Sequence, residues 1–205
     1  EWFDYASYSY FATTIALVFF PTDNHTVAML QTFGVFALSF ILRPIGALFW
    51  GSYGDKKGRK AALAHSIMFM SGASFLIGCL PSYSVIGVGA PILLLLLRMV
   101  QGFSASGEYA GAATFLGEYA PTSKRGIYCS LIPASTAIGL LAGSTLATLM
   151  TANMNSSAMV GWGWRVPFLL AGPLGLIVLY IRAKLADSPV YQSMNDALES
   201  KGAAS

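Results

Sequence analysis

Residues Gly51–Lys60 read GSYGDKKGRK, and the architecture of the chain follows from this stretch. It packs five charges and three glycines between two nearly uncharged apolar runs, Val27–Trp50 and Ala61–Leu80. Apolar runs of about 20 residues match the hydrocarbon core of a bilayer, which is roughly 30 Å thick. Lys and Arg collect in short cytoplasmic loops. The stretch therefore predicts a short, basic cytoplasmic loop that joins two membrane-spanning helices.

The composition of the whole chain favours the same class of protein. Of its 205 residues, 55% are hydrophobic and 10% are charged, and the mean hydropathy is +0.61. Soluble domains carry about 25% charged residues. The chain has no long Lys/Arg run with interleaved aromatic residues, so nucleic acid is not expected as a partner. The lipid bilayer is the expected environment.

The apolar runs along residues 1–185 predict an all-α membrane bundle with six transmembrane helices. The expected spans are Glu1–Phe20, Val27–Trp50, Ala61–Leu80, Pro91–Leu116, Ile127–Met150 and Val166–Leu185. The first span is expected to be truncated, because the chain opens without Met inside a mixed aromatic and apolar segment. Residues 186–205 turn polar, which predicts a cytoplasmic linker or tail.

The basic residues orient this bundle. Nine of the twelve Lys and Arg residues fall on one side of the predicted topology, namely Lys56, Lys57, Arg59, Lys60, Lys124, Arg125, Arg182, Lys184 and Lys201. Positive residues mark the cytoplasmic side of a membrane protein. We therefore expect a multi-pass protein of the plasma membrane, the inner membrane in a bacterium, with both ends of the chain in the cytoplasm.

Four charged residues stand out away from the ends of the predicted spans: Asp4, Arg43, Arg98 and Glu108. Ionisable residues are costly at bilayer depth, so each of them is by default a functional hypothesis. The alternative is that they only pair with one another as packing devices. For Arg43, which precedes a proline, the side chain could also extend to the cytoplasmic interface.

Helical periodicity places these charges on two polar stripes. At about 100° per residue, one flank of the fourth span carries Arg98, Gln101, Ser104 and Glu108, and one face of the first span carries Glu1, Asp4 and Tyr8. Such flanks must face protein or water. We expect the two stripes to meet across a cavity.

Enzyme signatures are weak. Gly102–Ser106 lacks the second glycine of a nucleophile elbow, and a hydrolase built on Ser104 and His65 is a remote alternative. The sequence has no metal-ligand spacing, no Walker loop and no dinucleotide fingerprint that follows a strand. We expect no catalytic residues, no metal and no cofactor.

Several motifs resemble the major facilitator superfamily of transporters. They are Gly51-x-x-x-Asp55-x-x-Gly58-Arg59-Lys60 between the second and third spans, Arg98-x-x-Gln101-Gly102, Glu118-Tyr119-Ala120-Pro121 with Arg125-Gly126, and Trp164-Arg165-x-Pro167-Phe168. Three more motifs narrow the resemblance to the metabolite:proton symporter family, which includes proline/betaine, 2-oxoglutarate, citrate and shikimate carriers. These are Glu1-Trp2-Phe3-Asp4, Arg43-Pro44-Ile45-Gly46 and Gly107-Glu108-Tyr109.

The resemblance implies a twelve-helix transporter built from two six-helix halves, of which this chain is the N-terminal half. It implies proton-coupled symport of a small organic solute by alternating access, with the missing C-terminal six-helix half as a partner. Asp4 and Glu108 become candidate proton or substrate groups, and Arg43 and Arg98 become candidate partners for carboxylates, with Gln101 and Tyr8 beside them. The expected conformational gate comprises Gly51, Asp55, Gly58, Arg59 and Arg125, with Asp55 and Arg59 as a cytoplasmic latch.

Two questions stay open at this point. The solute could be an osmolyte or amino-acid-like zwitterion such as proline or betaine, which Gly107–Ala112 favours slightly, or it could be an organic acid. The second question is whether the chain transports at all. The alternative is a truncated or non-transporting half-bundle that acts as a solute sensor or a partner-binding module.

Overall fold

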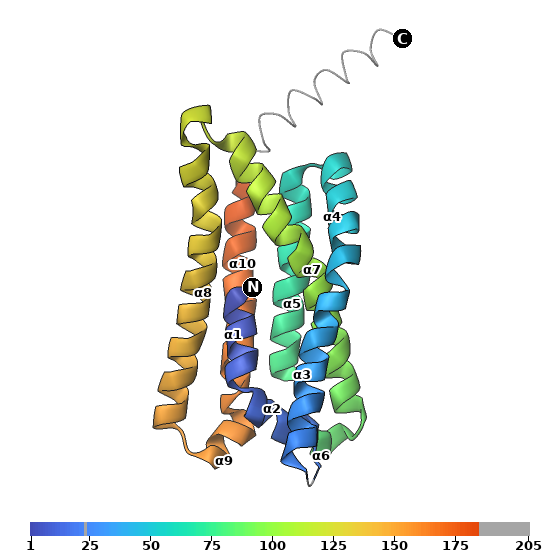
Figure 1. Cartoon of the computed structure of the whole chain (residues 1–205). Coiled ribbons are helices and arrows are strands. Elements are labelled where there is room, and N and C mark those ends of the chain that lie inside the picture. Colours follow the sequence, from blue (N-terminus) through green and yellow to red (C-terminus); the bar gives the residue numbers. More distant parts are fainter. Residues whose placement is uncertain (23, 185–205) are drawn as a thin grey trace.

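The computed structural model describes residues 1–22 and 24–184, and within these ranges the chain is helical without strands (Figure 1). The helices are α1 (Trp2–Tyr10), α2 (Ala12–Phe19), α3 (His25–Ile41), α4 (Arg43–Lys57), α5 (Arg59–Cys79), α6 (Tyr83–Ile86), α7 (Gly89–Tyr119), α8 (Arg125–Asn153), α9 (Ser156–Ala158) and α10 (Arg165–Lys184), with a 3-10 turn at Thr122–Lys124 and a π-helical turn at Met159–Gly163. The predicted linker or tail at 186–205 lies outside the described residues.

Within the described residues, five helical segments are long and apolar enough to cross a membrane: His25–Lys57, Lys60–Cys79, Gly89–Glu118, Thr122–Asn153 and Ser156–Ile181. The remaining predicted span corresponds to α1 and α2, which follow one another with a break at Phe11 and are too short separately. The all-α class is confirmed. The first predicted span, Glu1–Phe20, is thus a broken helix rather than a continuous one.

The expected loop at Gly51–Lys60 is wrong in its extent. Gly51–Lys57 is the last part of α4, and α5 begins at Arg59, so Gly58 alone connects the two helices. Gly58 has a φ of 94° and a ψ of 145°, a conformation that L side chains rarely adopt. The charges and two of the glycines that predicted a loop continue a helix instead, and the turn is concentrated in one glycine.

Helix α7 is central to the bundle, since it packs against α3, α4 and α5, while α5 also packs along α10 and α1 packs along α8. The backbones approach closely where α7 crosses α3 and α4. A Cβ on Gly102 would overlap the Ser39 carbonyl oxygen, and a Cβ on Gly46 would overlap the Phe103 carbonyl oxygen. Glycine permits this approach, as is common between membrane helices.

The apolar core lies at the end of the bundle that holds α2, α6 and α9 (Figure 1). Phe19 packs edge-on against Trp164 with ring centroids 5.3 Å apart, and both side chains are fully buried. The outer surface is also apolar: Leu48 is 77% exposed and Leu176 is 69% exposed. Apolar surface on this scale belongs in contact with lipid or protein rather than water.

Candidate functional site

A buried carboxyl group lies at the level where α1, α5 and α7 meet. Asp4 of α1 is almost completely buried, and its Oδ2 accepts hydrogen bonds from the hydroxyl of Ser74 on α5 and from Nε2 of Gln101 on α7, the latter over 2.8 Å. The same Gln101 nitrogen lies 2.6 Å from the Ser74 Oγ. Asp4 Oδ1 has no hydrogen-bond partner among the described residues. One carboxyl oxygen is therefore fixed and the other is available.

The guanidinium of Arg98 is buried one turn of α7 away from Gln101, with no exposed surface. Its Cζ lies 3.7 Å from the centroid of the Tyr8 ring, and none of its three nitrogens has a hydrogen-bond partner among the described residues. A buried cation normally pairs with a carboxylate because desolvation is costly. Here an aromatic face takes the place of the carboxylate.

The order of these contacts follows from the direction of the helices. In Figure 1, α1 runs toward α2 while α7 starts at that end and runs the other way. Asp4 and Tyr8 are separated by one turn of α1, and Gln101 and Arg98 by about one turn of α7. Antiparallel helices therefore match Asp4 with Gln101 and Tyr8 with Arg98. The two polar stripes expected from the sequence do meet at these residues. Gln101 binds Asp4 directly and Arg98 lies directly over Tyr8, so no cavity separates these two pairs.

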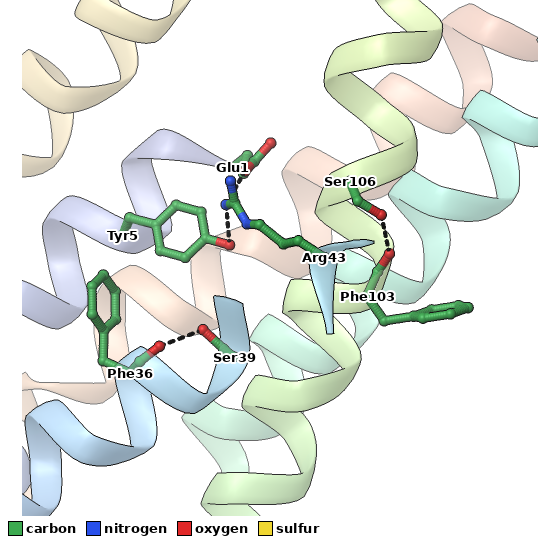
Figure 2. Close-up of polar contacts among 7 residues, drawn as sticks. All are labelled: Glu1, Tyr5, Phe36, Ser39, Arg43, Phe103 and Ser106. Carbon is green, nitrogen blue, oxygen red and sulfur yellow. Dashed lines mark hydrogen bonds and ion pairs between the residues drawn. The ribbon is translucent and has the colours of Figure 1, made fainter. Parts of the chain in front are cut away.

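Arg43 lies in a second charged cluster. Its Nη2 donates to Glu1 Oε1 and to the Tyr5 hydroxyl, each over 2.7 Å, and its Cζ lies 4.5 Å from the Phe40 ring centroid. Figure 2 shows the side chain reaching from the start of α4 to the first turn of α1. This ion pair joins the start of α4 to the start of α1. Arg43 therefore has protein partners and does not need to extend to the interface.

Glu108 lies apart from the Asp4 and Arg98 contacts. It lines a cavity of about 170 Å³ together with Glu1, Asp4 and Ser74. Its side chain is half-buried. The structure thus brings three carboxyl groups to the walls of one cavity.

The expected gate residues gather at the other end of the bundle from α2. Gly51 and Asp55 lie in α4, Gly58 connects α4 to α5, Arg59 is the first residue of α5, and Arg125 is the first residue of α8. Asp55 and Arg125 are exposed. The latch between Asp55 and Arg59 stays a prediction.

Sequence reasoning missed three residues that shape this centre. Ser74 supports Asp4, Thr32 accepts a hydrogen bond from the Tyr8 hydroxyl at its backbone oxygen over 2.9 Å, and the Phe36 ring stacks on Tyr8. A serine, a threonine and a phenylalanine in apolar spans are common, and no spacing signal sets them apart. In the described part of the chain, no group of three His, Cys, Asp or Glu residues could hold a metal ion.

This arrangement suits proton-linked chemistry. A carboxyl group that is buried without a cation is favoured in its neutral form, whereas a nearby guanidinium favours the charged form. In the structure Asp4 and Arg98 are not paired with each other: Asp4 binds Ser74 and Gln101, and Arg98 rests on Tyr8. The site thus combines a buried acid with a buried guanidinium that has no hydrogen-bond partner among the described residues.

Comparison with known proteins supports a transporter. The family model described as Sugar (and other) transporter matches residues 1–205. The chain belongs to this family. Proteins with similar sequences are named as transporters rather than enzymes.

The chain is 43% identical over 199 residues to a proline/betaine transporter of Salmonella typhimurium, which covers 97% of this chain and 40% of that protein. It is equally similar, with the same coverage, to the glycine betaine/proline/ectoine/pipecolic acid transporter OusA of Dickeya dadantii. The family member described here thus spans about two fifths of the length of these relatives. The resemblance to a transporter family that includes proline/betaine carriers is confirmed.

Solved structures show the fold. The major facilitator proton:xylose symporter XylE bound to 6-bromo-6-deoxy-D-glucose has a TM-score of 0.82 at 17% identity, covering 93% of this chain and 42% of that one. A partially occluded, inward-open structure of XylE from E. coli has a TM-score of 0.82 at 20% identity, covering 95% and 47%. The bundle is the N-terminal half of a major facilitator fold.

Proposed function

We propose that this chain is the N-terminal half of a proton-coupled symporter for a small zwitterionic solute of the proline or betaine type. The named substrates of relatives that are 43% identical support the substrate class over an organic acid. Because the chain spans 40% of those relatives, the complete transporter is taken to be this chain continued by a second six-helix half. The solute would bind between the two halves.

The observation that carries this proposal is the contact pattern of Asp4 and Arg98. Asp4 is bound by the neutral groups of Ser74 and Gln101, and Arg98 rests on Tyr8 without a hydrogen-bond partner among the described residues. We assign this arrangement to the proton-loaded state, in which Asp4 is neutral. Loss of the proton would leave a buried carboxylate, which attracts the unpaired guanidinium. A proton would thereby be exchanged for an ion pair that joins α1 to α7.

Glu108 and Arg43 have secondary roles in this proposal. Glu108 shares a cavity wall with Asp4 and is a candidate relay for protons or a contact for the cationic end of the solute. Arg43 is already paired with Glu1, so it is a candidate for the solute carboxylate only after that pair opens. Arg98 is the stronger candidate, because its donors are unused among the described residues.

Orientation and gating belong to the same proposal. Because basic residues mark the cytoplasmic side, the end of α4 and the starts of α5 and α8 would meet the cytoplasm, in a plasma membrane with both chain ends inside. Asp55, Gly51, Gly58, Arg59 and Arg125 would then form a cytoplasmic gate against the second half. The compact turn at Gly58 supports such a role, since it holds the end of α4 directly beside the start of α5.

The test is uptake into proteoliposomes by the complete transporter under an imposed inward proton gradient. Radiolabelled proline, glycine betaine, citrate and 2-oxoglutarate are compared with and without an uncoupler. We expect the two zwitterions to accumulate, and we expect the uncoupler to abolish accumulation. Accumulation of the two acids alone would reject the substrate class, and accumulation that resists the uncoupler would reject proton coupling.

A further inference from the structure

The guanidinium of Arg98 lies over the aromatic ring of Tyr8, away from the carboxyl group of Asp4. The guanidinium carbon lies 3.7 Å from the ring centroid, which is the closest cation–aromatic contact among the described residues. Two more rings are further away, Phe168 at 5.8 Å and Phe36 at 5.9 Å. Cation–π contacts are strongest where both partners are removed from water. Arg98 and Tyr8 are both fully buried.

The Tyr8 ring is held rigidly in this position. Its hydroxyl donates to the Thr32 carbonyl oxygen over 2.9 Å, and the Thr32 hydroxyl in turn donates to the Ala28 carbonyl oxygen over 2.9 Å. The Phe36 ring also stacks on Tyr8 at 5.6 Å with an interplanar angle of 11°. The ring is therefore fixed by α3, whereas no hydrogen bond among the described residues holds the Arg98 guanidinium on the ring.

The groups around Arg98 offer its guanidinium two positions inside the bundle, on the Tyr8 ring or beside Asp4. The titratable groups nearest to it are on α1, where Tyr8 lies under the guanidinium and Asp4 and Tyr5 lie about one turn away. The elements α3 and α10 contribute the neutral rings Phe36 and Phe168, and α5 contributes Ser74, which is bound to Asp4. Asp4 and Tyr8 are one turn apart on α1, which is about 6 Å along the helix. A long, flexible arginine side chain can cross that distance by rotamer changes alone.

We propose that the ring of Tyr8 is a resting position for the Arg98 guanidinium while Asp4 holds its proton, and that the strength of this contact sets the proton concentration at which the transporter works. This inference rests on the proposed proton-coupled function and adds a positioning residue to it. Without the ring, Arg98 would have no stable alternative to Asp4. The ion pair would then compete more strongly with the proton.

The test measures the pH dependence of solute uptake by the complete transporter, with solute counterflow as a measure of binding and movement that needs no net proton transfer. Tyr8→Leu removes the aromatic face. We expect its half-maximal uptake to require about a tenfold higher proton concentration, since a buried cation–π contact is lost. Phe36→Leu, which keeps Tyr8 but removes the ring stacked on it, should shift in the same direction by less.

Two further variants distinguish the ring of Tyr8 from its hydroxyl and from a general change in α1. Tyr8→Phe keeps the ring and loses the hydroxyl, so its pH midpoint should stay at the wild-type value even if its rate falls. Tyr10→Leu changes a tyrosine of the same helix that is 61% exposed, and it should not shift the midpoint. If the Tyr8→Leu protein does not fold, the test uses Phe36→Leu, and the pH midpoint of its solute uptake must still move.

Two results would overturn the inference. In the first, Tyr8→Leu or Phe36→Leu still supports counterflow, and the pH midpoint of its solute uptake equals that of the wild type. In the second, Tyr8→Phe shifts the pH midpoint of uptake as far as Tyr8→Leu does. The second outcome would place the effect in the hydroxyl bond to Thr32. The Asp4→Asn variant distinguishes failure of this inference from failure of the proposed function. If the proposed function is wrong, Asp4→Asn accumulates solute in response to the proton gradient. If only the resting position on Tyr8 is wrong, Asp4→Asn does not accumulate solute in response to the gradient.

Discussion

At the scale of single residues, Arg165 stabilises the junction between α5 and α10. Its Nη1 donates to the carbonyl oxygens of Gly78 over 2.8 Å and Leu80 over 2.5 Å, and its guanidinium lies 4.6 Å from the Trp164 ring. The last carbonyls of a helix have no partner within the helix, so an arginine that binds them satisfies groups that would otherwise be unpaired. The side chain thus caps α5 from the start of α10.

We predict that Arg165→Met lowers the free energy of unfolding by about 2 kcal/mol, because hydrogen bonds from a charged donor are lost. Thermal unfolding in detergent micelles measures the effect. Lys124→Met is the matched control, since Lys124 is exposed in a short 3-10 turn, and it should change the stability by less than about 0.5 kcal/mol. Equal stability of the two variants would show that the cap contributes nothing.

At the scale of elements, α3 and α7 approach so closely where Gly102 meets Ser39 that a Cβ on Gly102 would overlap the Ser39 carbonyl oxygen. We predict that Gly102→Ala lowers the free energy of unfolding by about 3 kcal/mol, because a methyl group cannot share space with a backbone oxygen and the helices must separate. The same thermal assay applies.

The control for this crossing is Gly72→Ala. Gly72 lies within α5, and a Cβ there would have no neighbour within 4 Å. Alanine favours the helix over glycine by up to about 1 kcal/mol, so this variant should be as stable as the wild type or more stable. If both variants lost stability to the same degree, the cause would be the loss of glycine rather than the crossing.

The elements also show why some of the fold could not be read from the sequence. Apolar run length predicted the all-α bundle, because a bilayer fixes the length of a span. The same rule could not show that Gly51–Lys57 stays helical, since glycines and charges are equally typical of turns. Likewise, no residue type marks the break at Phe11 between α1 and α2. Tertiary packing decides both.

At the scale of the whole molecule, helical spacing predicted that Asp4 lies on a stripe facing the one that holds Arg98 and Gln101, because each stripe occupies one face of its helix, and Asp4 and Gln101 are hydrogen-bonded in the structure. Helical spacing could not predict which residues of the other helices these side chains contact. Contacts to Ser74 and Phe36 depend on the register between helices, and register is set by packing across the bundle. The pairing of Arg43 with Glu1, rather than with a central acid, has the same origin.

Asp4 is the group on which proton coupling depends in the proposed transporter. The decisive comparison is Asp4→Asn against the wild type in proteoliposomes that contain the complete transporter. An amide keeps the size of the side chain but cannot exchange a proton. We expect Asp4→Asn to retain solute counterflow and to lose accumulation driven by a proton gradient. Accumulation by Asp4→Asn at the wild-type level, abolished by an uncoupler, would contradict a coupling role for Asp4.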